Sequence, residues 1–349
     1  MRKTLKLKPI KIKNRLVGEN RPCYIIAEIG SNFDGDINKA KKLIKKAKDA
    51  GADAAKFQSF ETNKILSRNG FEEKVSFQSI WKKSVWDTYK NAELPIKWIK
   101  ILNKFAKKCG IQFLSAPYHK EAVDELIKCN IPVIKIGSGE ITNIEFLKYI
   151  AKRQKPIFLA TGASTLKEID SAIKSILKEG NNKIILMQAT TQYPSPIEDT
   201  NLRVIDMFRE KFRLNVGYSD HTPGYTSILG SIALGASVVE KHFTLNTKSN
   251  GPDHPHSLGP TEFKEMVTKI REMELALGHS KKIITKSENK TKIIQRRGIW
   301  TTTEIKKGEK FTKDNLDVLR PCVGLPASDF SKLLSKKARK NYLAFTALK

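Results

Sequence analysis

The 349-residue sequence lacks several features that would place it in other protein classes. It has no run of eighteen apolar residues, so we expect no membrane-spanning helix and no membrane partner. Its four cysteines are far apart and form no Cys-x-x-Cys pair, which is typical of free thiols in a reducing cytoplasm. The start, MRKTLKLKPIKIKNRLVG, is charged and has no apolar stretch, so the sequence predicts no signal peptide and a cytoplasmic location.

Acidic residues are scarce relative to basic ones. There are 36 Asp and Glu against 64 Lys and Arg, which gives a formal net charge of +28. Nucleic-acid binding is one interpretation of such a charge. However, lysine far outnumbers arginine, the lysines are spread over helices such as 39–48, and no patch of arginine and aromatic residues occurs. We therefore interpret the charge as a lysine-rich surface and expect no nucleic-acid partner. A basic field also attracts small anionic substrates.

A short apolar strand, a turn and an amphipathic helix recur along the chain from residue 23. The clearest helix is 37–50, with one apolar face, Asp36 as its cap and Gly51 as its stop. The eight strand candidates are 23–28, 53–58, 111–115, 132–136, 156–160, 183–187, 214–218 and 237–242. Eight such units in about 250 residues predict an α/β fold, a (β/α)8 TIM barrel. A doubly wound open sheet is the alternative, but no Gly-x-Gly-x-x-Gly motif follows the first strand.

The chain is predicted to consist of a barrel, a linker and a small second domain. The barrel occupies 1–278, and its residues 60–95 exceed an ordinary loop and should form an excursion over the barrel mouth. Residues 279–295 are polar and lysine-rich and are interpreted as a linker. Short strand candidates and a KKGE turn follow, and they predict a separate β-rich domain at 296–349.

Polar residues stand at the ends of the predicted strands, where TIM barrels carry their chemistry. Lys56 and Lys135 end the second and fourth strands. Two lysines favour a doubly anionic ligand over Schiff-base chemistry, which needs only one. Ser138, in the segment KIGSGE, lies in a turn whose backbone N–H groups can bind an anion. The other polar residues at strand ends are Glu28, Gln58, Ser115, Thr161, Gln188, Thr190, Thr191 and Ser219.

Two of the six histidines, His221 and His242, stand at the ends of the seventh and eighth strands. Adjacent strands lie about 4.8 Å apart, so both rings can reach one ion. Two imidazoles with open positions suit Mn²⁺, Fe²⁺ or Zn²⁺, and the carboxylates in range are Asp220, Glu240, Asp253 and Glu28. The alternative is two unrelated histidines in hydrogen bonds. His254 and His256 could also join the ion, but they follow a Gly/Pro turn, and we expect them to line a loop instead.

Several stretches of the sequence together resemble the sialic acid synthase family, which includes legionaminic and pseudaminic acid synthases. They are IIAEIGSNFDGD, GADAAKFQ, KIGSGE, TTQYPSPIED, GYSDHTPGY, ALGASVVEKHFT and GPDHPHSL. The C-terminal RRGIWTTTEIKKGEKFTKDNLDVLRP resembles the SAF (antifreeze-like) domain that follows the barrel in that family.

The resemblance implies an activity, a cofactor and an assembly. The enzyme would condense phosphoenolpyruvate with the open-chain aldehyde of an N-acetylated hexosamine such as N-acetylmannosamine, giving a nine-carbon 2-keto acid and phosphate. The alternative acceptor is a deoxy diacetamido hexose, as for legionaminic or pseudaminic acid synthases. A divalent metal is implied, with Mn²⁺ expected and Mg²⁺ or Co²⁺ as alternatives. A domain-swapped homodimer is implied as well.

Carried over by motif position, the resemblance also implies residue roles. His221 and His242 would be the metal ligands and, with Glu28, the catalytic residues. Phosphoenolpyruvate would be bound by Lys56, Gln58, Ser115, Lys135, Ser138, Thr191 and Ser219. The sugar would contact Glu28, Tyr193, Asp253 and, from the SAF domain, Arg320.

The sequence departs from the family pattern at three positions. Phe33 replaces a histidine, Ala116 a common threonine and Ala160 a common serine. The last two remove hydroxyls expected near phosphate, which suggests a weaker phosphate site, a different sugar or compensation by the backbone. Two other functions therefore stay open, a Schiff-base aldolase on the same barrel and a non-catalytic protein that binds sugar or nucleic acid.

Overall fold

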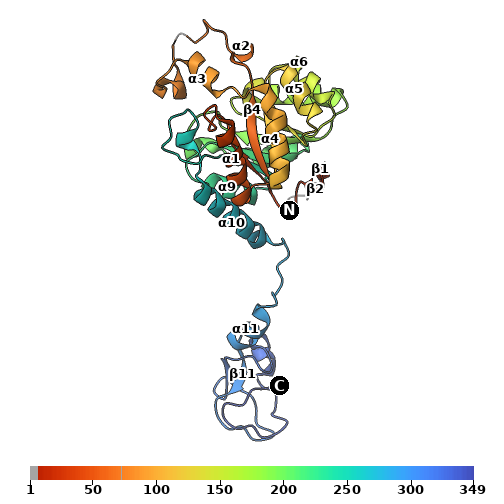
Figure 1. Ribbon diagram of the computed structural model, residues 1–349. Helices are drawn as coiled ribbons and strands as arrows, with labels where there is room; N and C mark the ends of the chain where they lie inside the picture. Colours follow the sequence, from red (N-terminus) through yellow and green to blue (C-terminus); the bar gives the residue numbers. More distant parts are fainter. Residues whose placement is uncertain (1–6, 72) are drawn as a thin grey trace. The chain divides into compact units, whose positions relative to one another are not determined.

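The computed structural model describes residues 7–71 and 73–349 (Figure 1). The expectation that no signal peptide is present rests partly on the first six residues, which lie outside this range. The chain divides into two compact units between Gly278 and His279, and each unit is described by itself. Among the described residues, no helix combines the length and apolarity that crossing a bilayer requires.

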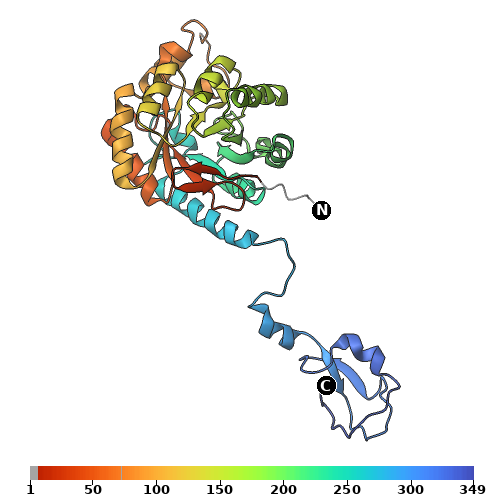
Figure 2. The same cartoon turned by 90° about the vertical axis from the view of Figure 1, so that its right-hand side faces the viewer.

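The first unit is built on eight parallel strands, as predicted (Figure 2). They are β3 (Tyr24–Glu28), β4 (Ala54–Ser59), β5 (Gln112–Pro117), β6 (Ile134–Ile136), β7 (Ile157–Ala160), β8 (Ile184–Ala189), β9 (Asn215–Asp220) and β10 (Val238–His242). The first strand of this set, β3, pairs with both β4 and the last strand, β10. The end strands of the ladder, β5 and β6, also lie side by side, so the sheet curls into a nearly closed barrel.

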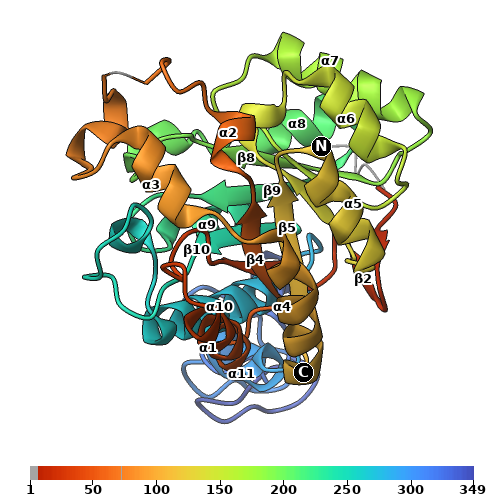
Figure 3. The same cartoon turned by 45° about the horizontal axis from the view of Figure 1, so that its top comes forward.

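Helices surround the barrel, and α1, α4 and α10 are neighbours on one side of it (Figure 3). The helices between and after the strands are α1 (Ile37–Asp49), α4 (Ile96–Cys109), α5 (Lys120–Lys128), α6 (Ile144–Ala151), α7 (Leu166–Lys178), α8 (Val204–Phe212), α9 (Thr226–Ala233) and α10 (Pro260–Leu277). Helix α1 confirms the predicted pattern, because the Asp36 side chain accepts from Asn38 N and the apolar face is buried. Burial of Leu43 and Ile44 on that face stabilises the fold by roughly 1.5–3 kcal/mol each.

Two apolar layers result from the alternation of side chains along the strands. One lies between the strands and the helices, and the other fills the barrel interior. The interior layer is closed at the amino ends of the strands by Ile10, Ile12 and Val17 from the hairpin β1 (Ile10–Ile12) and β2 (Arg15–Val17). In Figure 1 this hairpin and the helix α2 (Thr62–Ile65) lie at opposite ends of the barrel.

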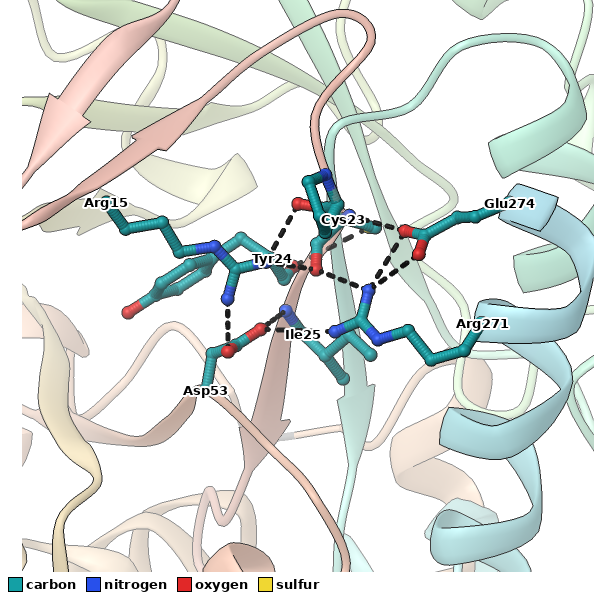
Figure 4. Close-up of polar contacts among 8 residues, drawn as sticks. Arg15, Cys23, Tyr24, Ile25, Asp53, Arg271 and Glu274 are labelled. Carbon is teal, nitrogen blue, oxygen red and sulfur yellow. Dashed lines mark hydrogen bonds and ion pairs between the residues drawn. The ribbon is translucent and has the colours of Figure 1, made fainter. Parts of the chain in front are cut away.

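A polar network ties the hairpin to the barrel at the amino ends of the strands (Figure 4). Arg15 forms an ion pair with Asp53 and donates to the carbonyls of Pro22 and Cys23 at 2.8 Å. Asp53 also accepts from Ile25 N at 2.8 Å. From α10, Arg271 donates to the Cys23 carbonyl and to Glu274. Because TIM-barrel chemistry lies at the opposite face, we assign this network to stability.

Residues 60–95 form an excursion at the carboxyl ends of the strands. It consists of α2, the 3₁₀ turn η1 (Ser76–Ile80) and α3 (Val85–Ala92). Its aromatic rings pack on one another, with Phe60 5.7 Å from Tyr89 and Phe77 5.8 Å from Trp81, measured between centroids. The excursion therefore brings an aromatic surface to the barrel mouth.

The second unit is small and contains an antiparallel pair, β11 (Gly298–Thr301) with β12 (Leu316–Leu319). Short turns η5 (Ala327–Asp329) and α12 (Phe330–Leu333) follow, and the core includes Ile299, Ile305, Phe311, Leu316 and Leu348. The second half of the predicted linker differs from expectation, because it forms the helix α11 (Glu288–Gln295). Thr285 and Glu288 exchange hydrogen bonds at its start, as in a capping box, which stabilises the first turn.

Candidate active site

Strand register brings charged side chains from distant parts of the sequence into the carboxyl end of the barrel interior. His242 pairs with Glu28, and Glu28 with Lys56, across β10, β3 and β4. Glu240 pairs with Ser219 on β9 in the same way. Residues in register on parallel strands point to the same side of a sheet, as do residues two apart on one strand, so these side chains all face the barrel interior.

An ion network connects these side chains. The Lys135 ammonium group donates to both oxygens of Glu240 at 2.8 Å. The Lys56 ammonium group lies 2.8 Å from Glu28 Oε2 and 3.5 Å from Glu240 Oε1. Gln58 Nε2 donates to Glu28 Oε1 at 2.8 Å, and Ser219 Oγ donates to Glu240 Oε1 at 3.2 Å. Both lysines are only 3% exposed, so the network is removed from bulk water.

Burial acts differently on the two carboxyl groups of this network. It raises the pKa of Glu28 to about 7, and the attraction of Lys56 offsets only part of that effect. For Glu240, burial is outweighed by the ammonium groups of Lys135 and Lys56, which lower its pKa to about 2. The pKa of Lys135 is lowered by burial although Glu240 opposes the shift. At neutral pH, Glu240 is thus a fixed anion, whereas Glu28 can gain or lose a proton.

A polar cradle lies at the ends of the neighbouring strands β6, β7 and β8. Ser138, in the turn η2 (Ser138–Glu140), accepts a hydrogen bond from Gly162 N at 3.0 Å. Thr191 Oγ1 is buried and has no partner among the described residues. A Cβ atom at Gly162 would collide with Thr191 Oγ1 and press on Ser138 Oγ, so glycine keeps the cradle open. Its groups suit an anion such as phosphate.

Ser115 does not join this cluster, in contrast to its predicted role with phosphoenolpyruvate. It pairs with Phe57, whose ring belongs to the layer between strands and helices, and Ala116 pairs with Gln58. The Ser115 hydroxyl is bonded to Ser59 Oγ at 2.7 Å and donates to the Phe57 carbonyl. One position along a strand reverses the face of a side chain, so the inward position is Ala116, which has no hydroxyl.

The other two departures from the family pattern lie in different surroundings. Ala160 pairs with Met187 and faces the barrel interior, 3% exposed. Phe33 is fully buried and packs against Phe57 and Trp98 in the outer apolar layer, with centroids 6.1 and 6.2 Å away. The loss of hydroxyls at 116 and 160 therefore concerns the site, whereas Phe33 belongs to the apolar core.

The two predicted metal ligands lie close together at the barrel mouth. The centroids of the His221 and His242 rings are 5.6 Å apart, and the Tyr193 ring lies tilted against His221 with its centroid 4.3 Å away. His221 Nδ1 is 2.7 Å from the Thr190 carbonyl, which leaves Nε2 free for another partner. Burial lowers the pKa of His221 to about 4 and that of His242 well below its ordinary value. Both rings are neutral at pH 7, the form that binds metal ions.

A third histidine, His256, was expected to line a loop but lies beside His242, with ring centroids 4.6 Å apart. Ligand atoms of His242, Asp253 and His256 lie within 4.8 Å of one another. His242 Nδ1 and His256 Nε2 are buried and have no hydrogen-bond partner among the described residues. These orphaned nitrogens and the nearby carboxylate fit a divalent metal ion, which would satisfy them.

Asp253 is held in place by the turn after β3. Its Oδ2 accepts from Ser31 N and Ser31 Oγ, both at 2.8 Å. Gly30 has φ 53°, and any side chain there would collide with the Asp253 carboxylate. Glycine is thus required for this close approach.

A pocket of about 310 Å³ opens onto the histidines and the excursion. Its polar wall includes Ser31, Gln58, Tyr193, His242, Asp253 and His256. Its apolar wall includes Phe60, Ile65, Leu66, Phe77, Trp81 and Tyr89. A second hollow of about 300 Å³ is lined by residues such as Glu61, Glu93 and His119, and none of the predicted site residues lines it.

Some of the strand-end residues are not brought to the site. Three of their side chains donate hydrogen bonds to backbone carbonyls instead: Thr161 to Met187, Gln188 to Thr200 and Thr190 to Asp199. Arg320 is exposed on the second unit, and its contact with a sugar stays a prediction. Sequence reasoning gave Glu240 only a general place near the metal. Side chains two residues apart on a strand face the same side, so the position of Glu240 two residues before His242 predicts that it points into the barrel with the lysines.

Comparisons with known proteins agree with this architecture. The sequence model of the NeuB family matches residues 43–282, and that of the SAF domain matches residues 296–343. The chain is 43% identical to the N,N'-diacetyllegionaminic acid synthase of Campylobacter jejuni, over 92% of this chain and 97% of that protein. It is 35% identical to a pseudaminic acid synthase of the same species, over 95% of this chain and 96% of that protein.

A solved structure supports the same grouping. The N-acetylneuraminic acid (sialic acid) synthetase of Leptospira borgpetersenii, in complex with citrate, matches with a TM-score of 0.74 and 30% identity. The match covers 82% of this chain and 95% of that one. On the family match, the sequence identities and the shared barrel, this chain belongs to the NeuB family and carries a C-terminal SAF domain.

Proposed function

We propose that the chain is a nonulosonic acid synthase. It would condense phosphoenolpyruvate with the open-chain aldehyde of an N-acetylated hexosamine and release a nine-carbon 2-keto acid and phosphate. One observation carries the proposal: a buried lysine pair, a polar cradle and a cluster of histidines lie together at the carboxyl end of a TIM barrel.

Lys56 and Lys135 are the candidate partners of phosphoenolpyruvate. Glu240 and Glu28 carry two negative charges at most, and burial raises the pKa of Glu28 to about 7. The two ammonium groups are therefore not fully neutralised, so an anionic substrate adds favourable interactions. Ser138, Thr191 and the Gly162 backbone would receive the phosphate, replacing the hydroxyls that are absent at 116 and 160.

The reaction joins C3 of phosphoenolpyruvate to the aldehyde carbon, whose oxygen takes up a proton. Water adds at C2, and phosphate leaves by cleavage of its C–O bond while the hydroxyl at C2 loses a proton to form the ketone. Glu28, with a pKa of about 7 and a hydrogen bond from Gln58, can carry a proton at neutral pH. Lys56 and Lys135 would stabilise the departing phosphate. A metal ion bound by the histidines would supply Lewis acidity to the aldehyde oxygen.

The acceptor is proposed to be a deoxy diacetamido hexose rather than N-acetylmannosamine. The pocket wall formed by Phe60, Leu66, Phe77 and Trp81 is apolar. Such a wall suits the methyl groups of a deoxy carbon and of acetamido substituents, and leaves a hydroxymethyl group without partners. The 43% identity to a diacetyllegionaminic acid synthase supports the same choice.

A Schiff-base aldolase is the alternative, because burial lowers the pKa of Lys135. Borohydride treatment with pyruvate separates the two functions, since an aldolase is trapped covalently and a synthase is not. The decisive assay measures phosphate release from phosphoenolpyruvate with a panel of hexosamines, with and without divalent metal. Release that needs both the sugar and the metal, and is fastest with the deoxy diacetamido acceptor, supports the proposal. No release with any acceptor would refute it.

A further inference from the structure

We propose that His256 is a metal ligand, so that the metal site contains a third imidazole, with Asp253, in addition to His221 and His242. The proposal extends the metal site of the proposed function and concerns binding of the ion itself. It depends on how the chain positions His256, on which nitrogen atoms lack partners, and on the spacing of the ligand atoms.

The backbone holds His256 next to the end of β10. His256 belongs to the turn η4 (His254–His256), and the chain after it runs parallel to the continuation of β10, where Phe243 pairs with Leu258. Leu258 N donates to the His242 carbonyl at 2.9 Å, and Thr244 N donates to the Leu258 carbonyl at 3.0 Å. These bonds fix the distance between His242 and His256. The loop is thus a continuation of the barrel wall.

The two histidines of this turn have different surroundings. His254 uses both nitrogens, with Nδ1 2.6 Å from Thr244 Oγ1 and Nε2 3.1 Å from Asp34 Oδ1. His256 Nε2 has no such partner among the described residues, although its side chain is only 3% exposed. An unpaired buried nitrogen is unfavourable and indicates a ligand. His254 therefore has a structural role, whereas His256, which lines the pocket, has its Nε2 available to bind a metal ion.

The spacing of the atoms fits one ion. His256 Nε2 lies 3.9 Å from Asp253 Oδ1, too far for a hydrogen bond. Two ligand atoms that share an ion at about 2.0–2.2 Å lie about 3–4 Å apart. The ligand atoms of His242, Asp253 and His256 lie within 4.8 Å of one another, so a closing movement of under about 1 Å would bring these three to one ion. The Tyr193 ring, 5.4 Å from His256, packs against the imidazole from one side.

A third imidazole changes which ions are preferred. Imidazole nitrogens favour ions such as Zn²⁺, Fe²⁺ and Co²⁺ over Mg²⁺, which prefers oxygen ligands and water. His256 should therefore raise the affinity for Co²⁺ much more than that for Mg²⁺.

The test measures binding of Co²⁺ and Mn²⁺ to the metal-stripped full chain by chelator competition, without substrates. We expect His256→Gln to weaken Co²⁺ binding about tenfold or more, with a smaller effect on Mg²⁺. The matched control, His279→Gln, removes an exposed histidine outside the barrel and should leave affinity unchanged. The melting temperature without metal shows whether each variant is folded. Co²⁺ affinity within twofold of the natural chain in folded His256→Gln overturns the proposal.

A measurement on the unaltered chain decides the question if the variants fail to fold. Electron spin-echo spectra of bound Mn²⁺ count the coordinated imidazole nitrogens. Three support the proposal, and two or fewer overturn it. Neither readout involves catalysis, so inactivity toward phosphoenolpyruvate with normal metal binding would count against the proposed function alone.

Discussion

Lys135 offers the sharpest test of the anion site, because its ammonium group contacts one carboxylate and faces the barrel mouth. Lys135→Met keeps the length and apolar stem of the side chain but removes the charge. One charge-assisted hydrogen bond to phosphoenolpyruvate is worth about 1.5–3 kcal/mol, so its affinity should fall about 10- to 150-fold. The sugar lies on the other side of the reacting atoms in our proposal, and its KM should change less than about threefold.

The same substitution leaves Glu240 with fewer partners. Breaking a buried ion pair destabilises a protein by roughly 3–5 kcal/mol. Glu240 keeps Lys56 at 3.5 Å and the Ser219 hydroxyl, so we expect the lower end of that range. The double variant Lys135→Met/Glu240→Gln removes both charges and should regain most of the lost stability. It should not regain phosphoenolpyruvate affinity fully, because the ammonium group is still missing.

Two assays separate binding from stability. Phosphate release at varied concentrations of each substrate gives the two KM values, and urea unfolding gives the free energy of unfolding. Lys183→Met, which removes an exposed lysine at the amino end of β8, serves as control. An equal loss for both substrates, or a double variant as unstable as Lys135→Met, would show that Lys135 is structural and refute the reasoning.

Three further predictions concern the metal ligands, the proton carrier and the assembly. His221→Ala or His242→Ala should abolish metal-dependent phosphate release in a folded chain. Near-normal activity with unchanged metal content would contradict the assignment. The folded state keeps the Glu28 proton to about pH 7, whereas the unfolded chain releases it near 4.5, so stability without metal should fall as pH rises between these values. Glu28→Gln should remove that fall, and an unchanged pH slope would argue against the raised pKa. If Arg320 acts on the partner's barrel in a swapped dimer, mixing inactive Glu28→Gln and Arg320→Ala chains should restore roughly a quarter of full activity after subunit exchange. No recovery from chains shown to exchange would exclude the swap.

The sequence predicted the barrel well because its strands are buried on both faces. Each apolar run that alternates with an amphipathic helix became a strand within one or two residues of the predicted start, since a parallel sheet covered by helices buries such runs on both faces. The residues of the site could be predicted less well from the sequence. Ser115 looked like an inward strand-end hydroxyl, but only the pairing of its neighbour Ala116 with Gln58 shows which face is inward. The Gly/Pro turn before His256 favours a loop, and its contact with His242 depends on a backbone pairing between Phe243 and Leu258 that the sequence does not reveal.

The segment Glu240-Lys241-His242 illustrates why composition at a strand end does not assign chemistry. Lys241 is as buried as Lys56 and Lys135, yet it faces the helices and forms an ion pair with Asp220 at 2.7 Å. Asp220 also accepts from Thr222 N and Ser227 Oγ, which holds the turn that carries His221. Alternate residues of one strand thus belong to two networks on opposite faces. In our proposal the inner network leaves positive charge for a substrate, whereas the outer one satisfies its carboxylate with partners from the protein. A third lysine at the strand ends therefore adds no anion-binding capacity, and its role is to keep the histidine turn in place.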